Sequence, residues 1–272
     1  MEQTVFALWQ RLCQSPYHFP MDQAVWDASM FHDVDSAGHL LFQNLQIKHT
    51  AHGFIQYGTT ALGFDYNGEL SDRVHYKVIR MLHFSSDHPE EGQQLLDAAI
   101  NAFGTGDRIY AFYHYFGMTA CARHGKLHES EAHVEKLLLR NGFLVEHENV
   151  YYAKRLSTPE TPKIPLDLQW KPKNAGYCRE FAAVYAGQEI GWGQVHFLPQ
   201  KDIAYLRWIY IDEKVQHQGF GTAIIQCLFR ELYNAGIVRF DTDTAANNLA
   251  AQAYYEKTGF TRCGITRSYY TK

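Results

Sequence analysis

The chain has 272 residues and a formal net charge of −4, with 46% hydrophobic and 15% aromatic residues. That apolar content can fill one large packed domain or two small ones, and it excludes a compositionally disordered protein. The acidic balance argues against a protein that binds nucleic acid by neutralising phosphates. No apolar run is long enough to cross a membrane.

The cysteines and the start of the chain indicate the compartment. The five cysteines are odd in number and far apart, without a C-x-x-C pair, so neither a disulfide framework nor a zinc ribbon is indicated. The residues after Met1 turn polar too early for a secretory signal. We therefore expect a cytoplasmic protein.

The first half mixes helical and alternating patterns and ends in a linker. Apolar residues at helical spacing predict helices at residues 1–15, Asp22–Asp33, Glu90–Phe103 and Glu131–Asn141. Alternation predicts strands between Leu40 and Tyr57 and at Val74–Phe84, Arg108–Tyr115 and Val150–Ala153. Ser157–Pro165 has three prolines in seven residues and no apolar period, which is typical of a semi-extended linker.

The second half predicts an α/β unit. Its strands are expected at Cys178–Tyr185, Ile190–Phe197, Ala204–Ile211, Val238–Thr244 and Thr266–Tyr270. Its helices are expected at Thr222–Asn234, and from Asn247 or Asn248 to the stop at Gly259.

A glycine pair lies between the strand that ends at Ile211 and the helix that follows. The stretch contains Gln216, His217, Gln218, Gly219, Phe220, Gly221 and Thr222. Two glycines let the backbone turn tightly and approach a ligand closely, and the N–H groups that open the helix suit a phosphate. Taken alone, the pair also fits an ordinary strand-to-helix turn. It is neither a GxGxxG loop nor a P-loop.

The helix downstream adds a second pattern. Asn248, Ala251 and Tyr255 lie at i, i+3 and i+7 and so share one face, while Tyr254 is expected to point elsewhere. Together the two stretches resemble the GNAT (Gcn5-related N-acetyltransferase) superfamily. Its Q/R-x-x-G-x-G/A loop corresponds to Gln216, Gly219 and Gly221. Its N-x-x-A-x-x-x-Y-x-x-x-G-F signature corresponds to Asn248, Ala251, Tyr255, Gly259 and Phe260, and the clear resemblance covers about residues 176–272.

Weak internal similarity predicts that the halves are copies of one unit. Ile79-Arg80-Met81 parallels Leu206-Arg207-Trp208, for example. In the first copy Glu90 and Gly92 correspond to Gly219 and Gly221, Glu131 to Asn248, and Leu138 to Tyr255. A carboxylate in the glycine loop repels a phosphate. We therefore expect an α/β (α+β) protein of two tandem GNAT-like domains, each a mixed, mostly antiparallel sheet flanked by helices. Residues 1–157 form the degenerate copy without cofactor, and residues 158–272 form the acyl-CoA-binding domain.

The resemblance implies roles for individual residues. Acetyl-CoA is expected to contact the backbone of two strand residues, the glycine loop and two positions on the last helix: Ile209, Ile211, Gln216, His217, Gln218, Gly219, Phe220, Gly221, Thr222, Asn248 and Tyr255. Tyr255 is the expected general acid for the departing thiolate. Many family members carry a Glu base on the preceding strand, where this chain has Tyr205 and Arg207. His196, Asp241 and Asp243 are the alternative bases, and the two aspartates could also attract a cationic amine.

A metal site is not expected. His124, His128 and His133 lack the H-E-x-x-H spacing, and no cysteine is paired with them.

These features predict an acyl-CoA-dependent N-acyltransferase for a primary amine of a small molecule, with acetyl-CoA as donor. No nucleic-acid or membrane partner is expected, and the oligomeric state stays open. One alternative is a non-catalytic coenzyme A-binding or regulatory protein on the same fold, because the strand glutamate is missing. Another is a protein that binds nucleotide phosphates without acyl chemistry.

Overall fold

The computed structural model describes residues 2–14, 17–31, 39–65, 70–104, 106–113, 116, 125–158, 161–172 and 178–272. It divides into two compact units. The first comprises most of the chain up to Glu148 together with Ile265–Lys272, and the second comprises Asn149–Gly264. Among the helices of these residues, none has the length and apolar character needed to span a membrane.

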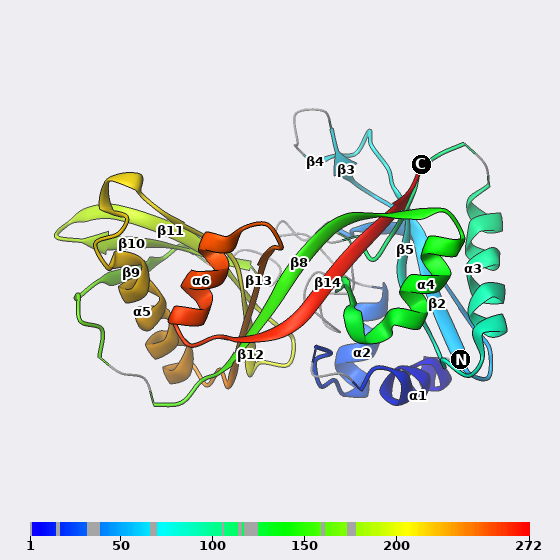
Figure 1. Cartoon of the computed structure of the whole chain (residues 1–272), viewed down its shortest axis with the longest axis horizontal. Coiled ribbons are helices and arrows are strands. Elements are labelled where there is room, and N and C mark those ends of the chain that lie inside the picture. The colour runs from blue at the N-terminus through cyan, green and yellow to red at the C-terminus, as the bar shows by residue number, and fades with distance from the viewer. Residues whose placement is uncertain are drawn as a thin grey trace. The chain divides into compact units, whose positions relative to one another are not determined.

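The first unit is a sheet with helices on both faces (Figure 1). Its helices are α1 (Glu2–Leu12), α2 (Gln23–Phe31), α3 (Pro89–Phe103) and α4 (Ala132–Arg140), the last preceded by the turn η2 (Glu129–Glu131). Its strands are β1 (Phe42–His49), β2 (Gly53–Thr60), β3 (Gly63–Phe64), β4 (Leu70–Ser71), β5 (Lys77–Phe84), β6 (Ile109–Ala111) and β7 (Leu127–His128).

Strand alternation explains the two covered faces. Phe54 of β2 packs in one cluster with Trp9 of α1 and Trp26 of α2. The next residue, Ile55, packs in another cluster with side chains of α3 and α4, including Leu138. Successive side chains of a strand point to opposite faces, so one apolar strand serves both cores.

The second unit has its helices on one face of the sheet. Its strands are β9 (Asp167–Trp170), β10 (Cys178–Tyr185), β11 (Gln188–Phe197), β12 (Ile203–Ile211) and β13 (Arg239–Ala245). Its helical segments are η3 (Glu213–Val215), α5 (Phe220–Asn234) and α6 (Leu249–Lys257). In α5 the predicted inward residues are all buried: Ile224, Ile225, Leu228 and Leu232. Phe240 of β13 meets the Phe229 ring of α5, so both lie on the helix-covered face.

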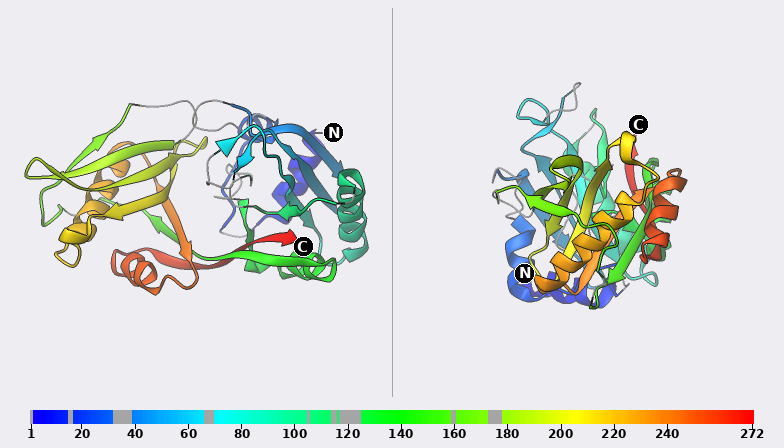
Figure 2. Two further views of the ribbon diagram at one scale, coloured as in Figure 1. Left: turned by 90° about the horizontal axis from the view of Figure 1, so that it is seen from above. Right: turned by 90° about the vertical axis from the view of Figure 1, so that its left-hand side faces the viewer.

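Two long strands contribute residues to both units: β8 (Phe143–Arg155) and β14 (Thr261–Thr271). Figures 1 and 2 show them side by side. Residues 149–155 of β8 pair with β13 in the second unit, and Tyr269 and Tyr270 of β14 pair with β6 in the first. The strand order is β1-β2-β5-β6-β14-β8-β13-β12-β11-β10-β9.

This exchange corrects two expectations from the sequence. Val150–Ala153 was expected to close the first half, and Thr266–Tyr270 to complete the second, whereas Val150–Ala153 pairs with β13 in the second unit and Tyr269 and Tyr270 pair with β6 in the first. The contacts therefore divide after Glu148 and again after Gly264, and not at 157. The end of β14 pairs with β6, and the second half of β8 pairs with β13. Without these segments, β6 and β13 would each be an exposed edge of the sheet.

The halves share one strand order. In each, an antiparallel pair (β2-β5 or β11-β12) is followed by a parallel pair (β5-β6 or β12-β13) with a helix between the parallel strands. Each antiparallel pair has one bulge, at Arg80 in β5 and at Arg207 in β12. A common order and a common irregularity support the predicted repeat.

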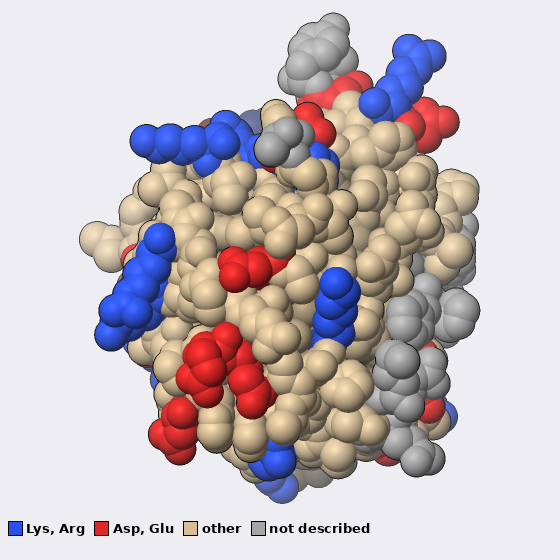
Figure 3. Space-filling model, turned by 90° about the vertical axis from the view of Figure 1, so that its right-hand side faces the viewer, with Lys and Arg blue, Asp and Glu red and all other residues tan. Residues whose placement is uncertain are grey.

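On the side of the first unit that carries α3, acidic and basic side chains alternate with uncharged areas (Figure 3). Basic side chains form no continuous band on the described part of that face.

Candidate active site

The parallel strands β12 and β13 separate half-way along their length. Four residue pairs are in register, from Ile203 opposite Arg239 to Leu206 opposite Thr242. Both strands are fully described and continue, to Ile211 and Ala245, without further pairing to each other. The bulge at Arg207 lies at the point of separation. A bulge bends its strand and increases its twist, which explains why β12 turns away from β13 there.

The separation leaves backbone groups of β12 facing the gap. The Asp212 N–H donates to Ile190 O at 2.9 Å, which makes Gly191 and Ile211 a non-hydrogen-bonded pair of the β11-β12 ladder. The N–H and C=O groups of such a residue point away from the partner strand. Ile211, and Ile209 two residues before it, thus direct backbone groups toward β13.

The glycine loop follows β12 and opens α5. Gly219 is the N-cap of α5 with φ of +91°, and His217 has φ of +61°. The N-cap has no side chain to accept from the first turn, so the N–H groups that open α5 lack a partner inside the helix. A Cβ on Gly221 would lie 2.7 Å from Ile211 Cδ1 and 3.3 Å from the Tyr254 ring, so a side chain there requires these neighbours to shift.

Two glutamines and a tyrosine brace this loop. Gln216 Nε2 donates to Ile211 O at 3.0 Å, and Gln218 Nε2 donates to Lys214 O at 2.9 Å. The Gln216 amide, which was expected to reach a ligand, therefore ties the loop to the end of β12. Tyr254 was expected to point elsewhere, but its hydroxyl donates to Gly221 O at 2.7 Å. Its role was missed because the helical pattern alone does not show that α6 packs against the loop.

Tyr255 lies on α6 beside the point where the strands separate. Its side chain is buried, at 6% exposure, against the rings of Tyr152 and Phe260. Burial raises the pKa of Tyr255, a hydrogen bond with Thr242 offsets part of this rise, and the charge of Asp243 adds to it. The hydroxyl is therefore protonated at neutral pH, as a general acid must be.

Asn248 caps α6. Its side chain accepts from the Ala251 N–H at 3.1 Å, which decides between the two asparagines considered from the sequence. Gly259, with φ of +87°, follows the C-cap, as predicted. The exposed Asn248 is thus a structural cap.

The other sequence candidates lie on the sheet face opposite α5 and α6. Asp241 is fully buried, pairs with Arg239 at 2.7 Å and accepts from the Tyr151 hydroxyl. Asp243 is only half-buried and accepts from the Tyr205 hydroxyl at 2.5 Å. His196 of β11 lies directly opposite Tyr205. The structure thus brings His196, Tyr205 and Asp243 together and gives the Asp241 carboxylate structural partners.

Comparison with known proteins agrees with this geometry. Residues 143–260 match the acetyltransferase (GNAT) family. The GNAT region therefore contains β12, the glycine loop, β13 and α6. The chain is 39% identical over 69 residues to the [Ribosomal protein bS18]-alanine N-acetyltransferase of Escherichia coli strain K12, a stretch that is 25% of this chain and 47% of that protein. The chain thus spans about half the length of the curated relatives it matches.

Solved structures show the same fold over nearly the whole chain. A tandem GNAT protein from the clavulanic acid biosynthesis pathway is matched over 99% of this chain and 94% of its own, with 12% identity and a TM-score of 0.62. A GNAT region of a fungal multi-domain GH3 β-N-acetylglucosaminidase is matched over 99% of this chain and 36% of its own, with 12% identity and a TM-score of 0.61. The mixed sheet flanked by helices, predicted from the sequence, is confirmed.

The equivalent turn of the first unit contains ionisable side chains in place of the glycine loop. Glu91 at the start of α3 accepts from His52 Nδ1 at 2.7 Å and from the His52 N–H at 2.9 Å. The His52 and His88 rings stack at 3.7 Å. The two histidine rings and the carboxylate lie where the second unit has its open helix N-terminus.

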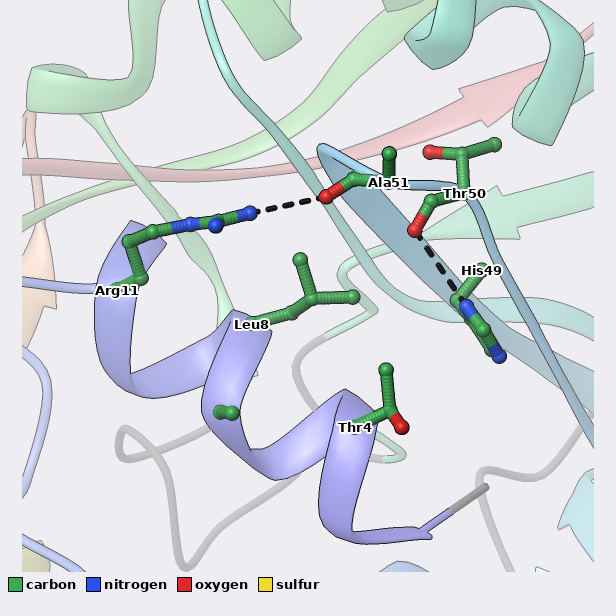
Figure 4. A pocket seen from close by; sticks show the side chains of 7 residues that line it. Thr4, Leu8, Arg11, His49, Thr50 and Ala51 are labelled. Atoms are coloured by element: carbon green, nitrogen blue, oxygen red, sulfur yellow. Dashed lines mark hydrogen bonds between the residues drawn. The ribbon is translucent and has the colours of Figure 1, made fainter.

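A surface pocket of about 440 Å³ in the first unit lies between α1 and the turn after β1 (Figure 4). It is lined by Thr4, Ala7, Leu8, Arg11, His49, Thr50 and Ala51. Arg11 donates to Ala51 O at 3.0 Å across it. Its described lining residues include no carboxylate, and the pocket carries no catalytic assignment. His128 and His133 contact Ser130 and Phe84 O, respectively, and His124 lies outside the described residues.

Proposed function

We propose that the second unit is an acyl-CoA-dependent N-acyltransferase that uses acetyl-CoA to acylate a primary amine of a small molecule. The separation of β12 and β13 beside the glycine loop is the observation that carries this proposal. Beyond Leu206 the backbone of β12 does not pair with β13, and the groups of Ile209 and the N–H of Ile211 suit the amides of a pantetheine arm. The open N-terminus of α5 suits a diphosphate.

Acetyl-CoA supplies an acyl group as a thioester, with a thiol as leaving group. Asp243, oriented by Tyr205, attracts the ammonium form of the acceptor, which loses one proton to solvent and so becomes the neutral amine that attacks. His196, or Asp243 through water, removes the proton that the attacking amine releases as the new C–N bond forms. Tyr255 donates the proton that the sulfur requires as the C–S bond breaks. Alignment of donor and acceptor supplies the rest of the rate enhancement.

A polypeptide amine is the competing acceptor. The relative in Escherichia coli acts, by its name, on an alanine of a ribosomal protein. An assay of thiol release from acetyl-CoA separates the classes, with one panel of small amines and one panel of peptides that begin with alanine. Turnover of a small amine supports the proposal. Turnover of the peptides alone would show that the acceptor is a polypeptide amine and not a small molecule. Binding of coenzyme A without any turnover would identify the protein as a non-catalytic binder.

A further inference from the structure

A buried cluster of nitrogen and sulfur ligands lies in the first unit. It contains Cys13 just after α1, His18 in the next loop and His83 on β5. Cys13 and His83 are 6% and 5% exposed, and the His18 side chain is 6% exposed. The Cys13 Sγ and one ring nitrogen of each histidine all lie within 4.8 Å of one another.

The fold brings these residues together from distant parts of the chain. The Cys13 N–H donates to Trp9 O at 2.8 Å, which continues the last turn of α1 and keeps Cys13 in the core beside Trp9. His83 is two residues from Met81 on β5, so both point to the face covered by α1 and α2. The His18 ring lies edge-on to the rings of Trp9 and His83, at 6.4 and 5.8 Å.

Glu131 joins the two histidines. One carboxylate oxygen lies 2.6 Å from His83 Nδ1, and the other lies 3.3 Å from His18 Nε2. A neutral imidazole that donates one N–H to a carboxylate has an unprotonated nitrogen at its other position. Metal-binding histidines usually carry such a carboxylate, which fixes the ring and raises its basicity.

We propose that Cys13, His18 and His83 bind a zinc ion, with Glu131 orienting the imidazoles. One thiolate and two imidazoles are the donors that Zn²⁺ prefers, whereas Mg²⁺ and Ca²⁺ require oxygen. Zinc bonds of about 2.0–2.3 Å require ligand atoms roughly 3.5 Å apart in a tetrahedron. The three side chains therefore move slightly inward around the ion, and water takes the fourth position.

The proposed ion stabilises the fold of the first unit. It links the end of α1, the loop at His18, β5 and, through Glu131, the start of α4. None of these residues belongs to the proposed acyl-transfer site of the second unit. Binding an ion to the folded form alone stabilises that form. This site was not predicted from the sequence, because its ligands are far apart in the chain and lack a spacing motif.

The test uses the full chain, stripped of metal with a chelator and purified without a histidine tag. Zinc is titrated in competition with a chromophoric chelator, and Co²⁺ is added as a spectroscopic probe. We expect one tightly bound equivalent of Zn²⁺ and a thiolate-to-cobalt charge-transfer band. Zinc should also raise the melting temperature. Absence of stoichiometric binding, or a cobalt spectrum without the thiolate band, would overturn the proposal.

Variants assign the ligands. Cys13→Ser should remove the charge-transfer band, and His83→Gln should remove the zinc-induced rise in melting temperature. Cys263→Ser, which alters a half-buried cysteine of the second unit, should leave both signals unchanged. Glu131→Gln should keep the stoichiometry but weaken zinc binding by about 10- to 100-fold. Equal zinc affinity in wild type and Cys13→Ser would contradict the assignment, and the cobalt spectrum of the wild type tests it even where a variant misfolds.

Discussion

Arg80 and Arg207 occupy equivalent bulges of β5 and β12, but only Arg80 is buried. Arg80 is 0% exposed and donates to Phe116 O at 3.2 Å and to Ser29 O at 3.3 Å. In the first unit the side chain at the bulge, Arg80, is therefore buried and donates hydrogen bonds to carbonyl groups around it. In the second unit the arginine is exposed, and the backbone beside it keeps a gap.

Replacing the two arginines should separate these roles. Arg80→Ala leaves buried carbonyls without a donor and creates a cavity, so we expect a loss of about 3 kcal/mol in the free energy of unfolding. Arg207→Ala should change that free energy by less than about 0.5 kcal/mol. Urea denaturation of both variants measures the free energy of unfolding. Similar losses in Arg80→Ala and Arg207→Ala would contradict the difference in role between the two arginines.

Two glycines with positive φ provide a matched test of the loop. Gly219 and Gly236 have φ of +91° and +84°, at opposite ends of α5. Alanine at either position should cost about 1 kcal/mol of stability, because L-residues disfavour this conformation. Only Gly219→Ala should also weaken coenzyme A binding, by at least about tenfold in Kd by calorimetry. Equal Kd values for the two variants would remove the loop from the proposed cofactor site.

Tyr255→Phe removes the proposed proton donor and keeps the ring packing against Tyr152 and Phe260. We expect kcat to fall by about 10²- to 10⁴-fold, the range for a general acid, with little change in coenzyme A affinity. Tyr254→Phe, which breaks the bond to Gly221 O, should instead weaken cofactor binding. Steady-state kinetics with acetyl-CoA distinguish the two, and full kcat in Tyr255→Phe would rule out its role.

Asp241 and Asp243 point to the same face of β13 but have different partners. Asp243→Asn should raise KM for the amine by about tenfold, since it removes the charge that Tyr205 orients, with little change in stability. Asp241→Asn should mainly lower stability, by about 2 kcal/mol, because Arg239 loses its partner. If steady-state kinetics and denaturation showed that Asp243→Asn mainly lowers stability and Asp241→Asn mainly raises KM, the roles assigned to the two aspartates would be exchanged.

The raised pKa of the Glu146 carboxyl leads us to expect that the stability of the first unit depends on pH. Burial raises the pKa of Glu146 to about 7, although a hydrogen bond from Ser268 and the charges of Arg108 and Lys126 oppose this. The folded state then holds this proton more tightly than the unfolded state does. Stability should fall as pH rises from about 4.5 to about 7. The difference in melting temperature between Glu146→Gln and wild type should therefore increase over that range, and a constant difference would contradict the raised pKa.

Local features were predictable from the sequence, and distant pairings were not. The cap at Asn248, the stop at Gly259 and the buried stripe of α5 follow from short-range patterns and are confirmed. The exchange of β8 and β14 was missed because alternation marks a strand but does not identify its partner. The contact of Tyr254 with the loop and the bond between Tyr205 and Asp243 likewise depend on packing between elements. The roles assigned to Tyr255 and His196 stay predictions.

Calorimetric titration of the full chain with coenzyme A tests the central claim most directly, with wild type and Gly221→Val compared. We expect one equivalent to bind wild type, and no measurable binding to Gly221→Val, because the added side chain collides with Ile211. Absence of binding to wild type, or unchanged binding to Gly221→Val, would contradict the proposal that the loop at 216–222 and the gap between β12 and β13 hold the cofactor.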